Sequence, residues 1–85
     1  MKIIYTNEFR KSFKKLPNEI KKEAFEKEKL FRKDIKDSKL KNHKLSGKLN
    51  GCWAFSINFN YRIIYEFGLD DIIYFHSVGT HDIYK

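Results

Sequence analysis

The spacing of apolar side chains changes from a helical period to a strand period in the second half of this chain. Before residue 36 the apolar residues recur every three or four positions, whereas after residue 52 they alternate with other residues. The first spacing is typical of amphipathic helices, and the second of strands with one buried face. The chain therefore has to pack a helical half against a strand-rich half.

The first half predicts one short strand and two helices. Residues 3–5 are β-branched or aromatic, and Thr6 can cap a helix that follows them. Pro17 ends that helix, because the residue before a proline avoids the helical conformation. Asn18 can cap a second helix. The apolar faces of the two helices comprise Phe9, Phe13 and Leu16 in the first, and Ile20, Ala24, Leu30, Phe31 and Ile35 in the second.

The second half predicts three strands after a polar, turn-rich segment at 38–51. Alternating apolar residues mark strands over 53–59, 61–67 and 72–78, with turn signals between them. Consecutive strands with short turns form an antiparallel meander, and only the two helices can cover its apolar face. We therefore expect an α+β fold of order β-α-α-β-β-β: a twisted antiparallel sheet covered on one face by a two-helix hairpin. Eighty-five residues predict one domain, 1–85.

Charge is divided unevenly along the chain. Up to Asn50 there are sixteen Lys and Arg against seven acidic residues, and after it two against four, for a net charge of +7. Clustered positive charge favours a polyanionic partner, because binding releases counterions. A nucleic acid is therefore the expected partner class.

Composition also argues against a disulfide-bonded, membrane-spanning, secreted or metal-binding protein. Cys52 is the only cysteine, so no intrachain disulfide is expected, and a reducing compartment, the cytoplasm, is the default. No apolar run reaches the roughly 20 residues of a membrane span, and the first six residues do not resemble a signal peptide. His43, His76 and His81 have no metal-site spacing, so neither a metal nor a cofactor is expected.

Arg62 is the one arginine in the strand-rich half. It alternates with Tyr61 and Ile63, so it should project from the face opposite the helices, with Glu66 on the same side. A guanidinium fixed on an open sheet face can hold a phosphate. The alternative is a solvated arginine paired with Glu66 or another acid, and both interpretations remain open.

Two histidines lie in turn-rich segments where side chains can reach a ligand. A metal-independent ribonuclease needs a base for the ribose 2′-hydroxyl, an acid for the leaving 5′-oxygen and a cation for the developing charge. Imidazole suits either proton transfer, since its ordinary pKa is about 6.5. The candidate set is His43, His81, Arg62, Asp82 and Tyr84, whereas His76 is expected to be an ordinary half-buried strand residue.

Three motifs, in this order, resemble the RelE/ParE toxin superfamily. They are H-x-L-x-G followed by G-x-W in residues 43–53, Y-R-I-I-Y in residues 61–65 and G-T-H from residue 79. The chain is most similar to the YafQ-like branch of messenger-RNA interferases. The resemblance implies a RelE-like toxin of a type II toxin–antitoxin pair. Such toxins cleave messenger RNA on the ribosome without a metal, and an acidic antitoxin neutralises them.

The resemblance also implies roles for single residues. The functional histidines of the branch map onto His43 and His81, and the phosphate-contacting strand arginine onto Arg62. A carboxyl-terminal aromatic that stacks on a base maps onto Tyr84. The remaining expected RNA contacts, with messenger or ribosomal RNA, are Lys41, Lys44, Lys48 and Asn60.

Two departures from the branch leave alternatives open. A strand histidine and a later acid of YafQ-like enzymes correspond to Ser56 and Asn60 here. Their loss would reduce activity, shift the roles to Asp82 and Tyr84, or leave a protein that is no nuclease. The alternatives are a non-catalytic ParE-like toxin that inhibits DNA gyrase and a degenerate antitoxin-binding module. The toxin is expected to be monomeric alone, to form a hetero-oligomer with its antitoxin, and to have no membrane partner.

Overall fold

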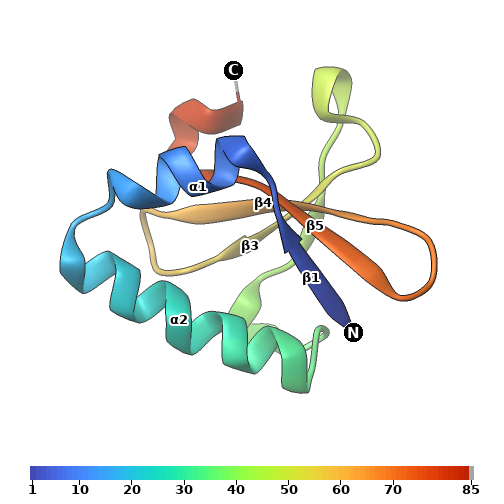
Figure 1. Ribbon diagram of the computed structural model, residues 1–85, viewed down its shortest axis with the longest axis horizontal. Helices are drawn as coiled ribbons and strands as arrows, with labels where there is room; N and C mark the ends of the chain where they lie inside the picture. Colours follow the sequence, from blue (N-terminus) through green and yellow to red (C-terminus); the bar gives the residue numbers. More distant parts are fainter. Residues whose placement is uncertain (85) are drawn as a thin grey trace.

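Two helices pack against one side of a five-stranded sheet (Figure 1). The computed structural model describes residues 1–84. Its helices and strands are β1 (Lys2–Tyr5), α1 (Asn7–Lys14), α2 (Asn18–Lys33), β2 (His43–Lys44), β3 (Trp53–Ser56), β4 (Arg62–Phe67) and β5 (Ile72–Gly79). Three 3-10 turns complete the order: η1 (Ser38–Leu40), η2 (Gly47–Leu49) and η3 (His81–Tyr84).

The predicted α+β architecture is confirmed, but the sheet is mixed. Its strand order is β1-β5-β4-β3-β2, and β3, β4 and β5 form the expected antiparallel meander. The first strand lies parallel to β5, with Ile3 opposite Ile73, and the two-residue strand β2 pairs with β3 inside the segment expected to be a loop. Strand partners depend on contacts distant in sequence, so local periodicity does not reveal them.

The helix boundaries follow local chemistry. Thr6 caps α1 as expected, because its hydroxyl accepts a hydrogen bond from the backbone N–H of Phe9 at 3.1 Å. The cap of α2 is Pro17 rather than Asn18, and no side chain bonds there. Ile35 lies beyond the end of α2 instead of on its apolar face, although it still packs against the core.

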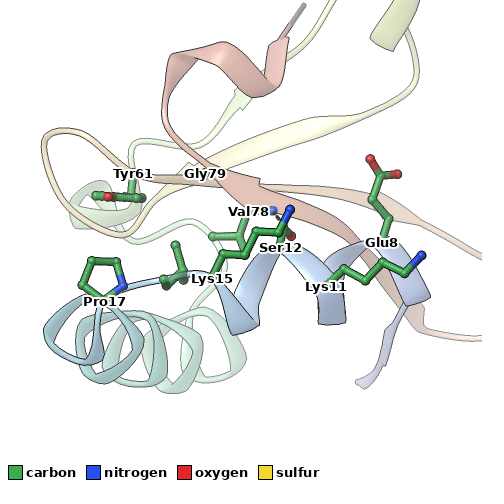
Figure 2. Close-up of a pocket in the computed structure, with 9 residues that line it drawn as sticks. Glu8, Lys11, Ser12, Lys15, Pro17, Tyr61, Val78 and Gly79 are labelled. Carbon is green, nitrogen blue, oxygen red and sulfur yellow. Dashed lines mark hydrogen bonds between the residues drawn. The ribbon is translucent and has the colours of Figure 1, made fainter.

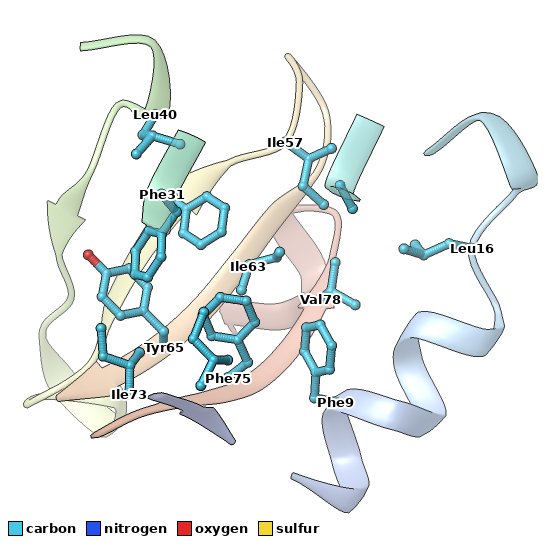
Figure 3. Close-up of a cluster of buried hydrophobic side chains, with 13 residues drawn as sticks. Phe9, Leu16, Phe31, Leu40, Ile57, Ile63, Tyr65, Ile73, Phe75 and Val78 are labelled. Atoms are coloured by element: carbon cyan, nitrogen blue, oxygen red, sulfur yellow. The ribbon is translucent and has the colours of Figure 1, made fainter. Parts of the chain in front are cut away.

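Aromatic rings fill the space between the helices and the sheet (Figure 3). Phe31 of α2 is fully buried and lies 4.7 Å from Phe55, 4.9 Å from Tyr65 and 5.6 Å from Phe75, measured between ring centroids. Aromatic contacts of this geometry add to the free energy gained by burying the rings. Phe31 therefore joins α2 to the three central strands.

The inward alternation stops earlier than predicted in β3. Ile57 is fully buried, but Phe59 is 87% exposed because the chain has already entered the turn before β4. Phe67 is 51% exposed at the end of β4. Trp53 packs against the core as expected. Among the described residues, no helix is both long and apolar enough to cross a membrane.

Replacing Phe31 with Ala should lower the free energy of unfolding by about 3–5 kcal/mol, because it removes a fully buried ring and leaves a cavity. Urea denaturation followed by the fluorescence of Trp53 measures this loss. Phe25→Ala is the matched control: Phe25 also lies on α2 but is 64% exposed, so its loss should be within about 0.5 kcal/mol. Equal losses for the two variants would contradict the assigned core.

Candidate functional site

The carboxyl-terminal segment, residues 80–84, crosses the sheet on the side opposite the helices, which we call the outer face. It leaves β5 after Gly79, and its last described ring, Tyr84, contacts His43 of β2. Strands β4 and β3 lie between β5 and β2, so the segment passes over both. The outer face was expected to be open, but at this position it is covered: Ala54, Ser56 and Ile64 are all buried.

Gly79 permits this crossing. A Cβ atom added at Gly79 would lie 2.5 Å from Cγ2 of Ile83, which is shorter than any normal contact. Ile83 in η3 therefore packs directly on the backbone of β5, and the absence of a side chain at residue 79 sets the height of the segment above the sheet. The backbone N–H of Ile83 donates to the carbonyl of Thr80 at 3.0 Å and closes the turn.

Tyr84 brings the two predicted loop histidines together. Its ring centroid lies 6.3 Å from that of His43 and 5.6 Å from that of His81, with edge-to-face geometry in both pairs. The two imidazoles are 38 residues apart in the sequence, yet the ring of Tyr84 lies between them. Both histidines are exposed to solvent. The Nδ1 atom of His43 also lies 3.3 Å from the carbonyl oxygen of Lys41, which helps to orient that ring.

The hydroxyl of Tyr84 points into the protein beside Arg62. Burial raises the pKa of Tyr84, and the neighbouring guanidinium opposes that shift by its charge and polar contact without cancelling it. The hydroxyl is buried but finds no hydrogen-bond partner of standard geometry within residues 1–84. The same holds for the hydroxyl of Ser56, which is the cross-strand neighbour of Arg62. Two hydroxyls beside Arg62 are thus buried without such a hydrogen-bond partner among the described residues, which is uncommon in folded proteins.

Backbone carbonyls of the turn between β3 and β4 hold Arg62 in place. Its Nη1 donates to the carbonyls of Asn58, Phe59 and Tyr61 at 2.8, 3.2 and 3.1 Å. The alternative pairing with Glu66 is not found, because Glu66 bonds His76 instead. Since a guanidinium has five N–H donors, the fixed Arg62 retains donors for a phosphate.

The other predicted site residues lie around this group. Asp82 is exposed in η3. Lys44 is exposed beside His43 in β2, and Lys48 lies on η2 in the loop that follows. Lys41, exposed, has a left-handed backbone conformation with φ of 50°. Asn60 is exposed in the turn between β3 and β4, whose carbonyls bind Arg62.

A basic hollow beside Gly79 was not expected from the sequence. It has a volume of about 440 Å³ and lies between α1 and the end of β5, near Tyr61 (Figure 2). Lys11 of α1 and Lys15, the residue directly after this helix, line it together with one acid, Glu8, as Figure 2 shows. Gly79 is also the strand partner of Arg62, so the hollow adjoins the site. The spacing of four between the two lysines was the available signal, but it is common on solvated helices.

Comparisons with known proteins agree with this architecture. A family model described as bacterial toxin of type II toxin–antitoxin system, YafQ, matches residues 1–84. The crystal structure of YafQ from E. coli BL21(DE3) superposes with a TM-score of 0.79 at 20% identity, covering 95% of this chain and 93% of that one. A search of curated proteins finds no match.

Two further structures share the fold. YafQ in the E. coli DinJ–YafQ toxin–antitoxin complex gives a TM-score of 0.76 at 21% identity, covering 95% of this chain and 92% of that one. A YoeB/ParE toxin from Agrobacterium tumefaciens gives a TM-score of 0.77 at 15% identity, covering 95% of this chain and 99% of that one.

Gly79→Ala should displace η3 and separate the Tyr84 ring from His43, because the added Cβ would overlap Ile83. We expect a loss of about 1–3 kcal/mol in the free energy of unfolding. In NMR spectra, the nuclear Overhauser effects between the two rings should disappear. Adding Ile83→Ala to this variant removes the overlapping methyl and should restore them. A Gly79→Ala protein that keeps these ring contacts would show that the segment is not positioned by this packing.

Proposed function

Because the chain belongs to the YafQ family of toxins of type II toxin–antitoxin systems, we propose that it is a metal-independent endoribonuclease that cleaves messenger RNA on the ribosome. The observation that carries this proposal is the contact of Tyr84 with both His43 and His81, beside Arg62. Four groups of the types that RNA cleavage requires thus meet on one face. Their site of action would be the cytoplasm, where messenger RNA is translated.

The reaction would begin with attack of the ribose 2′-hydroxyl on the adjacent phosphorus. The attacking oxygen gives its proton to a base, the bond from phosphorus to the 5′-oxygen breaks, and an acid protonates the leaving oxygen. A 2′,3′-cyclic phosphate and a 5′-hydroxyl result, so no water molecule and no metal ion is consumed or required. The protein has to supply two proton-transfer groups and one cation.

In this proposal His81 is the principal proton-transfer residue and His43 is its partner. Both imidazoles are exposed, so an RNA strand lying over Tyr84 would reach them. Imidazole exchanges protons efficiently near neutral pH. Asp82, beside His81 on η3, would assist by orienting or accepting a proton.

Arg62 would stabilise the charge that develops on the phosphate. Its three bonds to turn carbonyls fix the guanidinium before RNA binds, and preorganised charge is worth most in the transition state. Tyr84 would act as a neutral phenol: since burial raises its pKa, it donates a hydrogen bond and does not act as a base at neutral pH. A base could stack on the face of its ring.

The departures at Ser56 and Asn60 fit this division of roles. Ser56 is buried, so its hydroxyl is not placed to exchange protons with a bound RNA as an exposed histidine would be. Asn60 lies at the exposed tip of the turn, where its amide can bind RNA. Proton transfer would therefore fall to the histidines and to residues of η3.

Lysines on two sides of the site would position the RNA. Lys41, Lys44 and Lys48 lie on the β2 side, and Lys11 and Lys15 line the hollow on the β5 side. Contacts between lysine and phosphate set the register of a strand without selecting its sequence. Together they provide a basic track for messenger RNA or a ribosomal RNA surface.

His81→Ala should slow messenger-RNA cleavage by about 100-fold or more, because a residue that transfers a proton in the reaction raises the rate by roughly 10²–10⁴-fold. The measurement is the rate at which new RNA ends appear on translating ribosomes, mapped by primer extension. Thr80→Ala is the matched control, since it changes the exposed neighbour on the same segment and should cleave as the parent does.

A His81→Ala protein that cleaves at the parental rate would contradict the catalytic role of this histidine. Intact messenger RNA with gyrase-dependent DNA damage in cells that express the parent protein would favour the ParE-like alternative. Binding of antitoxin with neither effect would favour a degenerate module.

We further propose that an acidic antitoxin binds the groove on the helical side. This groove has a volume of about 610 Å³ and is bordered by α1, α2 and β1. Phe25 lies exposed at its edge, and two basic residues, Arg10 and Lys14, line it against one acid, Glu28. An amphipathic segment with acidic residues would complement both features. The groove is opposite the outer face, so antitoxin binding there would leave the site itself uncovered.

Phe25→Glu should weaken antitoxin binding at least tenfold, because it places a negative charge where an apolar contact with an acidic partner is expected. Isothermal titration with the protein encoded by the adjacent reading frame measures this. Lys22→Gln, which lowers the net charge by the same one unit at an exposed position of α2 outside the groove, is the control. Equal effects of the two variants would indicate general electrostatic attraction instead of docking in the groove.

A further inference from the structure

A second cluster of polar side chains lies on the outer face, separate from the proposed ribonuclease site. It consists of Cys52, directly before β3, Glu66 of β4 and His76 of β5. One potential ligand atom from each lies within 4.8 Å of the others, and Nε2 of His76 is 2.8 Å from Oε1 of Glu66. The strand pair formed by Ile64 and Ala54 separates this cluster from Arg62.

An irregularity in β5 lies directly at His76. Ile64 of β4 pairs with Ser77, whereas the next residue of β4 pairs with Phe75, so His76 has no residue opposite it. An extra residue of this kind forms a β-bulge, which redirects a side chain. Phe75 and Val78 consequently both remain buried in the core, while His76 and Ser77 are half-buried on the outer face. Alternation from the buried Phe75 puts His76 on the outer face near Glu66, and the bulge keeps Val78 in the core after two consecutive outward residues.

We propose that Cys52, Glu66 and His76 bind one Zn²⁺ ion. Thiolate, carboxylate and imidazole are the three ligand types that proteins use for zinc. Ligand atoms around a tetrahedral ion lie about 3.5 Å apart, so rotation of half-exposed side chains suffices to bring these three into place. Three protein ligands leave a fourth position for water.

The same residues do not form an activated nucleophile. Burial raises the pKa of the Cys52 thiol, and the negative charge of Glu66 raises it further. Reactive thiols have a lowered pKa and a neighbouring positive charge. A zinc ion would supply the missing positive charge and displace the thiol proton.

Zinc at this position would fix the loop that carries part of the basic track. The backbone N–H of Cys52 donates to the carbonyl of Leu49 at 2.9 Å, and its carbonyl accepts from the N–H of Leu45 at 2.9 Å. Cys52 therefore closes the loop over residues 45–51, which includes Lys48. Ligation of Cys52 to β4 and β5 would tie the base of this loop to the sheet. The zinc site does not depend on the ribonuclease proposal, because it uses none of its residues.

Titration of the reduced, metal-free protein with Co²⁺ tests the site, because tetrahedral Co²⁺ replaces Zn²⁺ and reports thiolate ligation by absorption. We expect one Co²⁺ per chain, a thiolate-to-cobalt charge-transfer band in the near ultraviolet, and loss of the band when Zn²⁺ is added. Cys52→Ser should abolish the band, and His76→Ala or Glu66→Gln should weaken binding at least tenfold. The melting temperature should rise with Zn²⁺ concentration in the parent but not in Cys52→Ser.

His43→Ala and His81→Ala are the controls, since both remove an exposed imidazole outside the cluster and should bind Co²⁺ as the parent does. Absence of the charge-transfer band would overturn the proposal. So would parental Co²⁺ affinity in Cys52→Ser, or loss of binding in either control variant, since those results would place the metal elsewhere.

Discussion

The packing of Ile83 on the bare backbone of Gly79 determines the arrangement of the outer face. With no side chain at residue 79, η3 lies close to the sheet and directs the chain across β4 and β3. Tyr84 then reaches His43 at the far side of the meander and remains in contact with His81. A segment of five residues thus brings into contact groups that are about forty positions apart in the sequence.

The two faces of the sheet have different roles: the inner face forms the core, and the outer face carries the proposed sites. The inner face builds a core of stacked aromatic rings around Phe31, which fixes the strands on which the outer face depends. The outer face presents the proposed ribonuclease site near Arg62 and the proposed zinc site around Cys52, whereas the proposed antitoxin groove lies on the helical side. A β-bulge at His76 keeps Val78 in the core although His76 and Ser77 both lie on the outer face.

Periodicity in the sequence predicted the helices, the meander and the burial of Phe31 and Phe55, because those depend on which residues recur on one face. It did not reveal the parallel pairing of β1, whose partner strand lies at the other end of the sequence, or the strand β2, whose two residues are too few to show alternation. The bulge at His76 was equally hidden, because it depends on the register between two strands. For this reason Glu66 was considered as a partner of Arg62, although it bonds His76.

The candidate site, too, could be predicted only in part from the sequence. The motifs pointed to His43, His81, Arg62 and Tyr84, and the structure brings these side chains into one neighbourhood, but alternation alone suggested an open face where the carboxyl-terminal segment lies. Coverage by a distant segment depends on the close approach at Gly79, which no pattern of apolar residues encodes. The partners of Arg62 are backbone carbonyls, which sequence does not distinguish.

The chemistry of the RNA ends produced on translating ribosomes is the most direct test of the central claim. Attack by the 2′-hydroxyl, assisted by imidazoles and a guanidinium, leaves a 2′,3′-cyclic phosphate or its 3′-phosphate hydrolysis product on one fragment and a 5′-hydroxyl on the other. Mass spectrometry of the fragments should show these ends, and a 2′-deoxy nucleotide at the cleavage position should prevent their formation. Fragments with a 3′-hydroxyl and a 5′-phosphate would contradict the account, because they require attack by water.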